Sequence, residues 1–122
     1  MAKKILVIED EKDIRDTIVY VLEEQGYDVT SSEDAKILKS LDTIKPDLIL
    51  LDNWLTEWKS DANGQQISKE LKSNPATSHI PIVMISAVSN IQEIARAGNA
   101  DDYLQKPFDL NDILEVVKKF TA

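Results

Sequence analysis

The stretch KILVIED, residues 4–10, decides the fold, because it joins an apolar run to two acidic residues. Two later stretches share this design, an apolar run that ends in one polar residue: LILLD at 48–52 and IVMIS at 82–86. Continuous apolar runs of this length are typical of parallel strands that are buried on both faces. Ligands of open α/β sheets bind where such strands end. We therefore expect the polar residues that end these runs to form one site: Glu9, Asp10, Asp52 and Ser86.

Helical periods separate the strands, with apolar residues that recur every three or four positions. The first helix ends near Gly26, the second runs from Ala35 to just before Pro46, and the third starts near Gly64 and ends before Asn74. Two shorter strands are predicted at residues 27–30 and 102–105. The chain therefore reads as an α/β fold of the (βα)5 type, with right-handed crossovers that place helices on both faces of a parallel sheet.

The last two helices have predicted N-terminal caps. Asn90, with Glu93 three residues later, reads as a capping box for the fourth helix, which stops near Gly98. Asp109 is expected to cap the fifth helix.

Composition narrows the possible functions. The chain has 122 residues, 43% of them hydrophobic, which suits a single domain spanning residues 1–122. Fourteen basic and 22 acidic residues give a net charge of −8, which disfavours binding to nucleic acid or anionic membranes. The absence of cysteine excludes disulfides and cysteine nucleophiles. The N-terminal apolar run is too short for a signal peptide or a membrane span, so we expect a cytoplasmic protein.

The acidic residues at the predicted sheet edge require a cation. Hard oxygen ligands favour Mg²⁺, and Lys106, at the end of the last strand, supplies a second positive charge. An anion held by both is most naturally a phosphoryl group, which a carboxylate can accept as an acyl phosphate. Ser86 could donate a hydrogen bond to it. Each residue alone has a plainer interpretation as a cap or a solvated side chain, but their placement at one edge favours a site.

Four motifs carry a resemblance to a known family: ILVIEDE at 5–11, DLILLD at 47–52, IPIVMISA at 80–87 and ADDYLQKPF at 100–108. The chain resembles the receiver domain of two-component response regulators over its whole length. The resemblance implies a flavodoxin-like three-layer fold with a five-stranded parallel sheet in the order 2-1-3-4-5.

The resemblance also implies a metal site and an acceptor. Asp52 matches the phosphoacceptor, Asp10 the direct Mg²⁺ ligand, and Glu9 its acidic neighbour, which often acts through water. The backbone carbonyl of Trp54 is expected to complete the protein's share of the metal ligands.

Further matches concern the switch. Ser86 matches the hydroxyl that reorients to the phosphoryl group, and Lys106 matches its charge partner. Pro107 is expected to follow a cis peptide bond. Tyr103 matches the aromatic residue whose rotamer follows phosphorylation, although a half-buried strand tyrosine is an equally good interpretation.

The chain departs from the family pattern in two places. Gly64 lies twelve residues after Asp52, so the loop at residues 53–63 is longer than usual. The loop is either a tolerated insertion or a means by which Trp54 shields the acyl phosphate from water. Ser86 and Lys106 are 20 residues apart, about two fewer than usual, which predicts a shorter fourth helix or leading loop.

The predicted function is a stand-alone switch. A sensor histidine kinase or a histidine phosphotransfer protein would supply the phosphoryl group, because the only histidine, His79, lies in a predicted loop. A downstream protein would bind the face formed by the fourth helix, the last strand and the last helix, with the chain as a monomer or weak homodimer. Two alternatives stay open. The chain could be a small Mg²⁺-dependent phosphatase or phosphotransferase with Asp52 as nucleophile, or a degenerate receiver that acts without phosphorylation. The first is disfavoured because Trp54 stands where many such enzymes carry a second aspartate.

Overall fold

One parallel sheet in the order β2-β1-β3-β4-β5 forms the centre of the computed structural model, which describes residues 2–53, 64–87 and 89–121. The order and the parallel pairing confirm the predicted fold class. The strands are β1 (Lys4–Ile8), β2 (Asp28–Ser32), β3 (Leu48–Asp52), β4 (Ile82–Ser86) and β5 (Asp102–Gln105).

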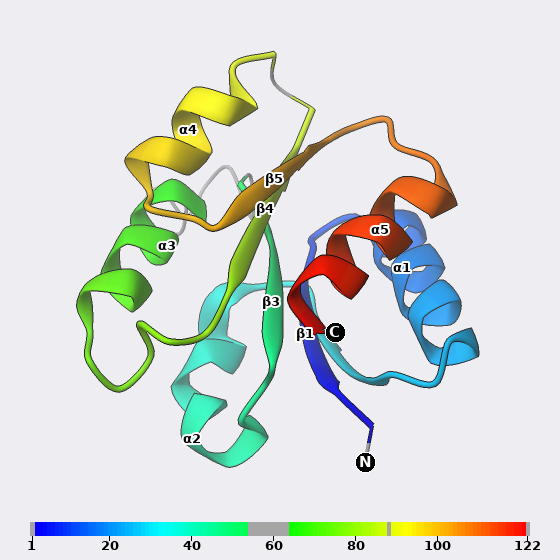
Figure 1. Ribbon diagram of the computed structural model, residues 1–122, viewed down its shortest axis with the longest axis horizontal. Coiled ribbons are helices and arrows are strands. Elements are labelled where there is room, and N and C mark those ends of the chain that lie inside the picture. Colours follow the sequence, from blue (N-terminus) through cyan, green and yellow to red (C-terminus); the bar gives the residue numbers. More distant parts are fainter. Residues whose placement is uncertain (1, 54–63, 88, 122) are drawn as a thin grey trace.

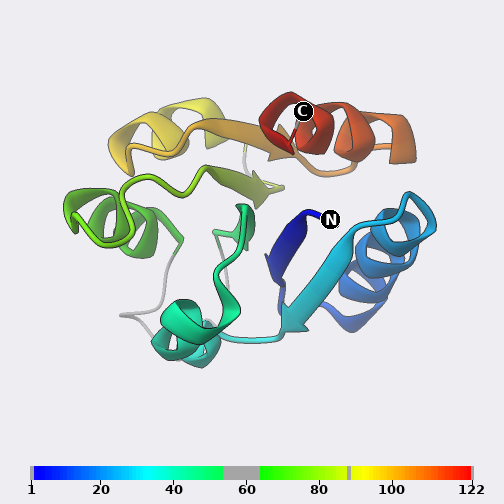
Figure 2. The ribbon, with the colours of Figure 1, turned by 60° about the horizontal axis from the view of Figure 1, so that its bottom comes forward.

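Helices cover both faces of the sheet, as Figure 1 and Figure 2 show. Packing in the core places α1 and α5 on one face and α2, α3 and α4 on the other. Among the described residues, no helix is both long and apolar enough to cross a membrane. The helices are α1 (Lys12–Glu24), the 3₁₀ helix η1 (Ala35–Ser40), α2 (Leu41–Ile44), α3 (Gly64–Ser73), α4 (Ile91–Ala97) and α5 (Leu110–Thr121).

Successive strand residues feed two separate cores, because side chains alternate between the faces of a sheet. On β3, Leu48 and Leu50 pack with α1 and α5, whereas Ile49 and Leu51 pack with α2, α3 and α4. Every residue of β3 and β4 is buried. This double burial explains why the strands read as continuous apolar runs rather than alternating ones.

Two predicted elements differ in detail. The second helix is split: Ala35–Ser40 is a 3₁₀ helix, and only Leu41–Ile44 is α-helical. The 3₁₀ geometry stacks residues three apart, which suits Leu38 and Leu41 because both pack into the same core. Strand β2 begins at Asp28 rather than at residue 27, because the Tyr27 amide bonds Leu22 O in the turn after α1.

The predicted capping box at α4 is wrong. Asn90 does precede the helix, but its side chain makes no capping hydrogen bond, and its ψ of 28° departs from the extended backbone that aims such a side chain. A capping box forms at α5 instead. The Asp112 amide donates to Asp109 Oδ1 at 3.0 Å, and the Asp109 amide donates to Asp112 Oδ2 at 3.2 Å. Asp109 therefore caps α5 as predicted.

Candidate functional site

Three carboxylates meet at the carboxyl edge of the sheet. Glu9 and Asp10 follow β1, and Asp52 ends the neighbouring strand β3. One carboxylate oxygen from each of the three lies within 4.8 Å of the others. Glu9 is 0% exposed and Asp52 2% exposed, whereas Asp10 faces solvent. Two of the three carboxyl groups are therefore largely removed from water.

Lys106, directly after β5, supplies the opposing charge. Its Nζ lies 2.9 Å from Glu9 Oε1, 3.5 Å from Glu11 Oε1 and 3.7 Å from Asp52 Oδ1, and its side chain is 11% exposed. Burial lowers the pKa of the Lys106 ammonium. The Glu9, Asp52 and Glu11 carboxylates more than offset this effect, so the pKa lies above its ordinary value and the group stays charged.

A single ammonium does not balance the cluster, and Asp52 shows the consequence. Burial, together with the Glu9 and Asp10 carboxyl groups, raises the pKa of Asp52 to about 9, while Lys106 acts in the opposite direction. Without a further cation, Asp52 therefore keeps a proton at neutral pH.

Glu9 carries a buried oxygen that a cation could use. Its Oε2 accepts a 3.3 Å hydrogen bond from the Glu11 amide. Its Oε1 lies close to the Lys106 ammonium but has no hydrogen bond of acceptable geometry with any described residue. The Lys106 ammonium, 2.9 Å away, offsets part of the cost of burying this oxygen.

The donor set fits Mg²⁺. Three converging carboxylates offer hard oxygen atoms, and Mg²⁺ is bound by one or two carboxylates together with water. The raised pKa of Asp52 reflects its burial and the neighbouring carboxyl groups, and a divalent cation would oppose this shift.

The comparison with known families agrees with this arrangement. A family model described as the response regulator receiver domain matches residues 5–118. The chain belongs to this family. It is thus a receiver domain of two-component response regulators.

Relatives with known names support the assignment. The receiver domain is 38% identical over 121 residues to the phosphate regulon transcriptional regulatory protein PhoB of Escherichia coli, which covers 97% of this chain and 51% of that protein. It is 37% identical to the alkaline phosphatase synthesis transcriptional regulatory protein PhoP of Bacillus subtilis, with coverage of 97% and 48%. The chain thus spans about half the length of these curated relatives.

Solved structures agree with the fold. The receiver domain of NtrX from Brucella abortus superposes with a TM-score of 0.82 at 32% identity, covering 97% of this chain and 99% of that chain. A putative response regulator from Chloroflexus aurantiacus gives a TM-score of 0.89 over 98% of both chains, and at 23% identity this likeness shows the fold alone.

The remaining predicted residues of the receiver domain lie at different distances from the cluster. Ser86 ends β4 beside Asp52 and is 1% exposed. Its backbone carbonyl accepts a 2.8 Å hydrogen bond from the Lys106 amide. The peptide bond between Lys106 and Pro107 is cis, as predicted. Tyr103 pairs with Met84 further back along the sheet, and the residue is 37% exposed. Trp54, and with it the predicted carbonyl ligand and shield, lies outside the described residues.

Two residues near the site were not predicted from the sequence. Asn53 is buried, and its Oδ1 accepts the Gln65 amide at 3.2 Å, which joins the residue after Asp52 to the start of α3. Arg15 donates from Nη1 to the Glu9 carbonyl at 2.9 Å. Neither contact leaves a periodic signal in the sequence, because each depends on how two elements meet in space.

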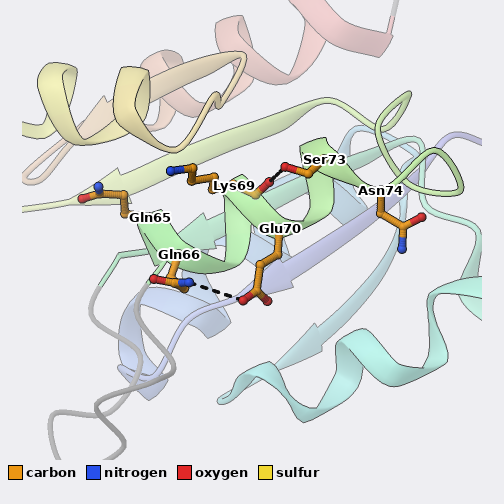
Figure 3. Close-up of a pocket in the computed structure, with 6 residues that line it drawn as sticks. All are labelled: Gln65, Gln66, Lys69, Glu70, Ser73 and Asn74. Atoms are coloured by element: carbon orange, nitrogen blue, oxygen red, sulfur yellow. Dashed lines mark hydrogen bonds between the residues drawn. The ribbon is translucent and has the colours of Figure 1, made fainter.

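A depression elsewhere on the surface does not compete with this site. It runs along the outer side of α3, and Figure 3 shows its polar lining. Its two internal hydrogen bonds, Gln66 to Glu70 and Ser73 to the Lys69 carbonyl, stay within the helix. With one lysine and one glutamate, the lining has no excess of charge for a cation or a phosphoryl group. The lining residues are Gln65, Gln66, Lys69, Glu70, Ser73 and Asn74.

Proposed function

We propose that residues 1–122 form a single receiver domain whose phosphoacceptor is Asp52. The observation that carries this proposal is the joint placement of Asp52 with Glu9, Asp10 and Lys106 at one sheet edge. Asp52 ends a fully buried strand, so the backbone of the acceptor is held rigidly while its carboxylate faces the opposing charges.

In this proposal Glu9, Asp10 and Asp52 hold Mg²⁺, together with the backbone carbonyl of Trp54. When bound, Mg²⁺ would neutralise charge on the phosphoryl oxygens and on the carboxylates. The positive charge of Mg²⁺ would favour the ionised form of Asp52, because it opposes the effect of the neighbouring carboxyl groups on the pKa of Asp52. The convergence of three carboxyl groups, two of them buried, and the raised pKa of Asp52 support this assignment.

The phosphoryl group comes from a phosphohistidine on a sensor histidine kinase or a histidine phosphotransfer protein. An Asp52 carboxylate oxygen attacks phosphorus, a new P–O bond forms, and the P–N bond to the partner's imidazole breaks. The leaving imidazole takes up a proton from water. Ser86 and Lys106 bind the phosphoryl oxygens on Asp52, since Ser86 ends the adjoining strand β4 and Lys106 Nζ lies 3.7 Å from Asp52 Oδ1.

The output is a change in partner binding. The new anion on Asp52 competes with Glu9 and Glu11 for the Lys106 ammonium, which shifts the end of β5. Tyr103, three residues earlier on the same strand, changes its rotamer with this shift. A downstream protein then binds the surface of α4, β5 and α5, with the receiver domain as a monomer or a weak homodimer.

The domain acts as a switch rather than as an enzyme on a free substrate. Its acidic surface disfavours direct contact with nucleic acid. Some relatives are DNA-binding proteins, such as the DNA-binding dual master transcriptional regulator RpaA of Synechocystis, which is about twice as long as the matched segment. In a longer protein of this kind, an additional segment would supply that contact.

Intact mass spectrometry tests the proposal. The protein is incubated with acetyl phosphate, with and without Mg²⁺, as the wild type, Asp52→Ala and Asp42→Ala, in which the lost aspartate is an exposed one on α2. We expect one phosphoryl adduct that requires Mg²⁺, is absent from Asp52→Ala and persists in Asp42→Ala. Rapid release of phosphate without an adduct would favour a phosphatase. No adduct and no released phosphate would favour a receiver that acts without phosphorylation.

A further inference from the structure

Arg15 connects the first turn of α1 to the end of β1. Its Nη1 donates a 2.9 Å hydrogen bond to the backbone oxygen of Glu9, six residues earlier in the chain. The Arg15 amide meanwhile makes a regular helical bond to the Glu11 carbonyl at 2.9 Å. The side chain is half-buried, so this charged donor is partly shielded from water and competes well for its acceptor.

The segment that Arg15 holds carries two of the three clustered carboxylates. Only three residues, Glu9 to Glu11, join β1 to α1. The Glu9 amide donates to the Ser32 carbonyl at 3.0 Å, and the Glu9 carbonyl accepts from Arg15, so both polar groups of this peptide backbone are fixed. The Glu9 side chain is in turn fixed by the Glu11 amide at Oε2. Each of these contacts restricts the directions in which Glu9 and Asp10 can point.

We propose that Arg15 is a positioning residue for the metal site: it holds the β1–α1 connection so that Glu9 and Asp10 face Asp52. This inference rests on the proposed role of these carboxylates in binding Mg²⁺. Residues that orient metal ligands through hydrogen bonds commonly affect metal affinity strongly without touching the metal themselves. Arg15 is placed to act in this way because its partner atom belongs to Glu9 itself.

The geometry predicts which property should change. The other site residues depend on other strands: Asp52 ends β3, Ser86 ends β4, and Lys106 directly follows β5. Among the described residues, Arg15 makes no hydrogen bond or ion pair with these three strands. Loss of the Arg15 side chain should therefore weaken Mg²⁺ binding and leave the rate at saturating Mg²⁺ almost intact. A general loss of folding would instead lower the amount of active protein at every Mg²⁺ concentration.

The chain offers a matched control, because its two arginines are Arg15 and Arg96. Arg96 is exposed in the last turn of α4, so Arg96→Ala removes the same charge from a distant element. Phosphorylation by acetyl phosphate is followed by intact mass over a range of Mg²⁺ concentrations for the wild type, Arg15→Ala, Arg15→Lys and Arg96→Ala. Mg²⁺ binding is also titrated directly by calorimetry, without a phosphodonor.

We expect Arg15→Ala to raise the half-saturating Mg²⁺ concentration by about 10-fold. Its maximal rate should stay within a factor of about two of the wild type. Arg15→Lys should recover part of the affinity, and Arg96→Ala should match the wild type. If Arg15→Ala does not fold, Arg15→Lys carries the test and should show a smaller shift in the same direction.

Equal Mg²⁺ dependence in the Arg15 and Arg96 variants would overturn the inference, as would a lower maximal rate with no change in Mg²⁺ dependence. A wild-type protein that takes up no phosphoryl group would count against the proposed function instead. The calorimetric titration would then still decide the role of Arg15, because it measures Mg²⁺ affinity alone.

Discussion

Asp52 is the residue at which neighbouring charges, proton binding and cation binding would influence one another. Its carboxyl group is buried beside two other carboxyl groups, and one lysine only partly compensates them. Burial and these neighbours raise its pKa from 3.8 to about 9. In the absence of a cation, the folded protein therefore keeps a proton on Asp52 between about pH 4 and pH 9. The unfolded chain has already lost this proton in the same pH range.

Asp52→Asn should remove the pH dependence that this proton causes. A group whose pKa is raised by folding makes its full contribution to the unfolding free energy at pH values below its unfolded pKa. This contribution is lost as the pH rises towards its folded pKa. Without Mg²⁺, the wild type should thus lose roughly 1 kcal/mol of unfolding free energy per pH unit between pH 6 and pH 8. Urea unfolding in the presence of a chelator measures this slope.

Asp52→Asn should show little of this slope, because an amide does not titrate. The control is Asp42→Asn, which changes an exposed aspartate and should keep the wild-type slope. Added Mg²⁺ should stabilise the wild type more at pH 8 than at pH 6. Equal losses of stability in the wild type and Asp52→Asn would show that Asp52 is not the titrating group.

Gly64 holds the start of α3 against the acceptor. A β-carbon at this position would lie 2.7 Å from Asn53 Cα and 2.8 Å from the backbone oxygen of Asp52. Both are backbone atoms at the site, so Gly64→Ala must displace them. We expect a loss of about 1–3 kcal/mol in unfolding free energy. We also expect slower phosphorylation, measured with acetyl phosphate and intact mass.

Gly98→Ala is the matched control for crowding. A β-carbon there would lie 2.9 Å from the backbone oxygen of Gln65, in the contact between α3 and α4. This variant should lose stability as well, but it should phosphorylate at a rate closer to that of the wild type. If both glycine variants slow phosphorylation equally, the effect comes from general destabilisation.

At the scale of single elements, the helix caps separate what the sequence could and could not predict. A capping residue type was present before both α4 and α5, but only Asp109 has a side chain that bonds the helix. The difference lies in the backbone angles at the cap, which the turn before each helix sets. Residue type alone does not report those angles.

Replacement of these two caps should therefore have unequal effects. Asp109→Ala removes an acceptor from the Asp112 amide and should cost about 1 kcal/mol of unfolding free energy. Asn90→Ala removes a side chain that makes no capping bond and should change stability by only a few tenths of a kcal/mol. Urea unfolding of both variants against the wild type checks this. Equal losses would contradict the capping assignment.

The strands were far more predictable than the caps. Burial on both faces forces an unbroken apolar run, and β1, β3 and β4 all lie where such runs occur. The meeting of Glu9, Asp10 and Asp52 followed from the shared carboxyl edge of those strands. The contact between Arg15 and Glu9 could not be predicted in this way, because it depends on the angle at which α1 leaves β1.

At the scale of the whole molecule, the two ends of the sheet have different tasks. The opposing charges of the candidate site lie at the carboxyl edge. At the other end, side-chain carboxylates extend the strand pairing: Asp47 Oδ2 accepts the Lys4 amide at 2.8 Å, and Asp101 Oδ2 accepts the Ile82 amide at 2.8 Å. Asp101 Oδ2 also lies 2.9 Å from Lys72 Nζ, which ties the end of α3 to the sheet. We infer that this end contributes stability and not chemistry.

Asp101→Ala tests that division. The substitution leaves the part-buried Ile82 amide without its acceptor and Lys72 without its ion pair, so we expect a loss of about 1–2 kcal/mol in unfolding free energy. The half-saturating Mg²⁺ concentration for phosphorylation should stay at the wild-type value, because the first residues of β4 and β5 lie a full strand length from Ser86 and Lys106. Arg15→Ala should show the opposite pattern, with a higher half-saturating Mg²⁺ concentration and a smaller effect on the unfolding free energy. If Asp101→Ala also shifts the Mg²⁺ dependence, then the two ends of the sheet are coupled, and the site depends on the packing of α3 as a whole rather than on its local contacts.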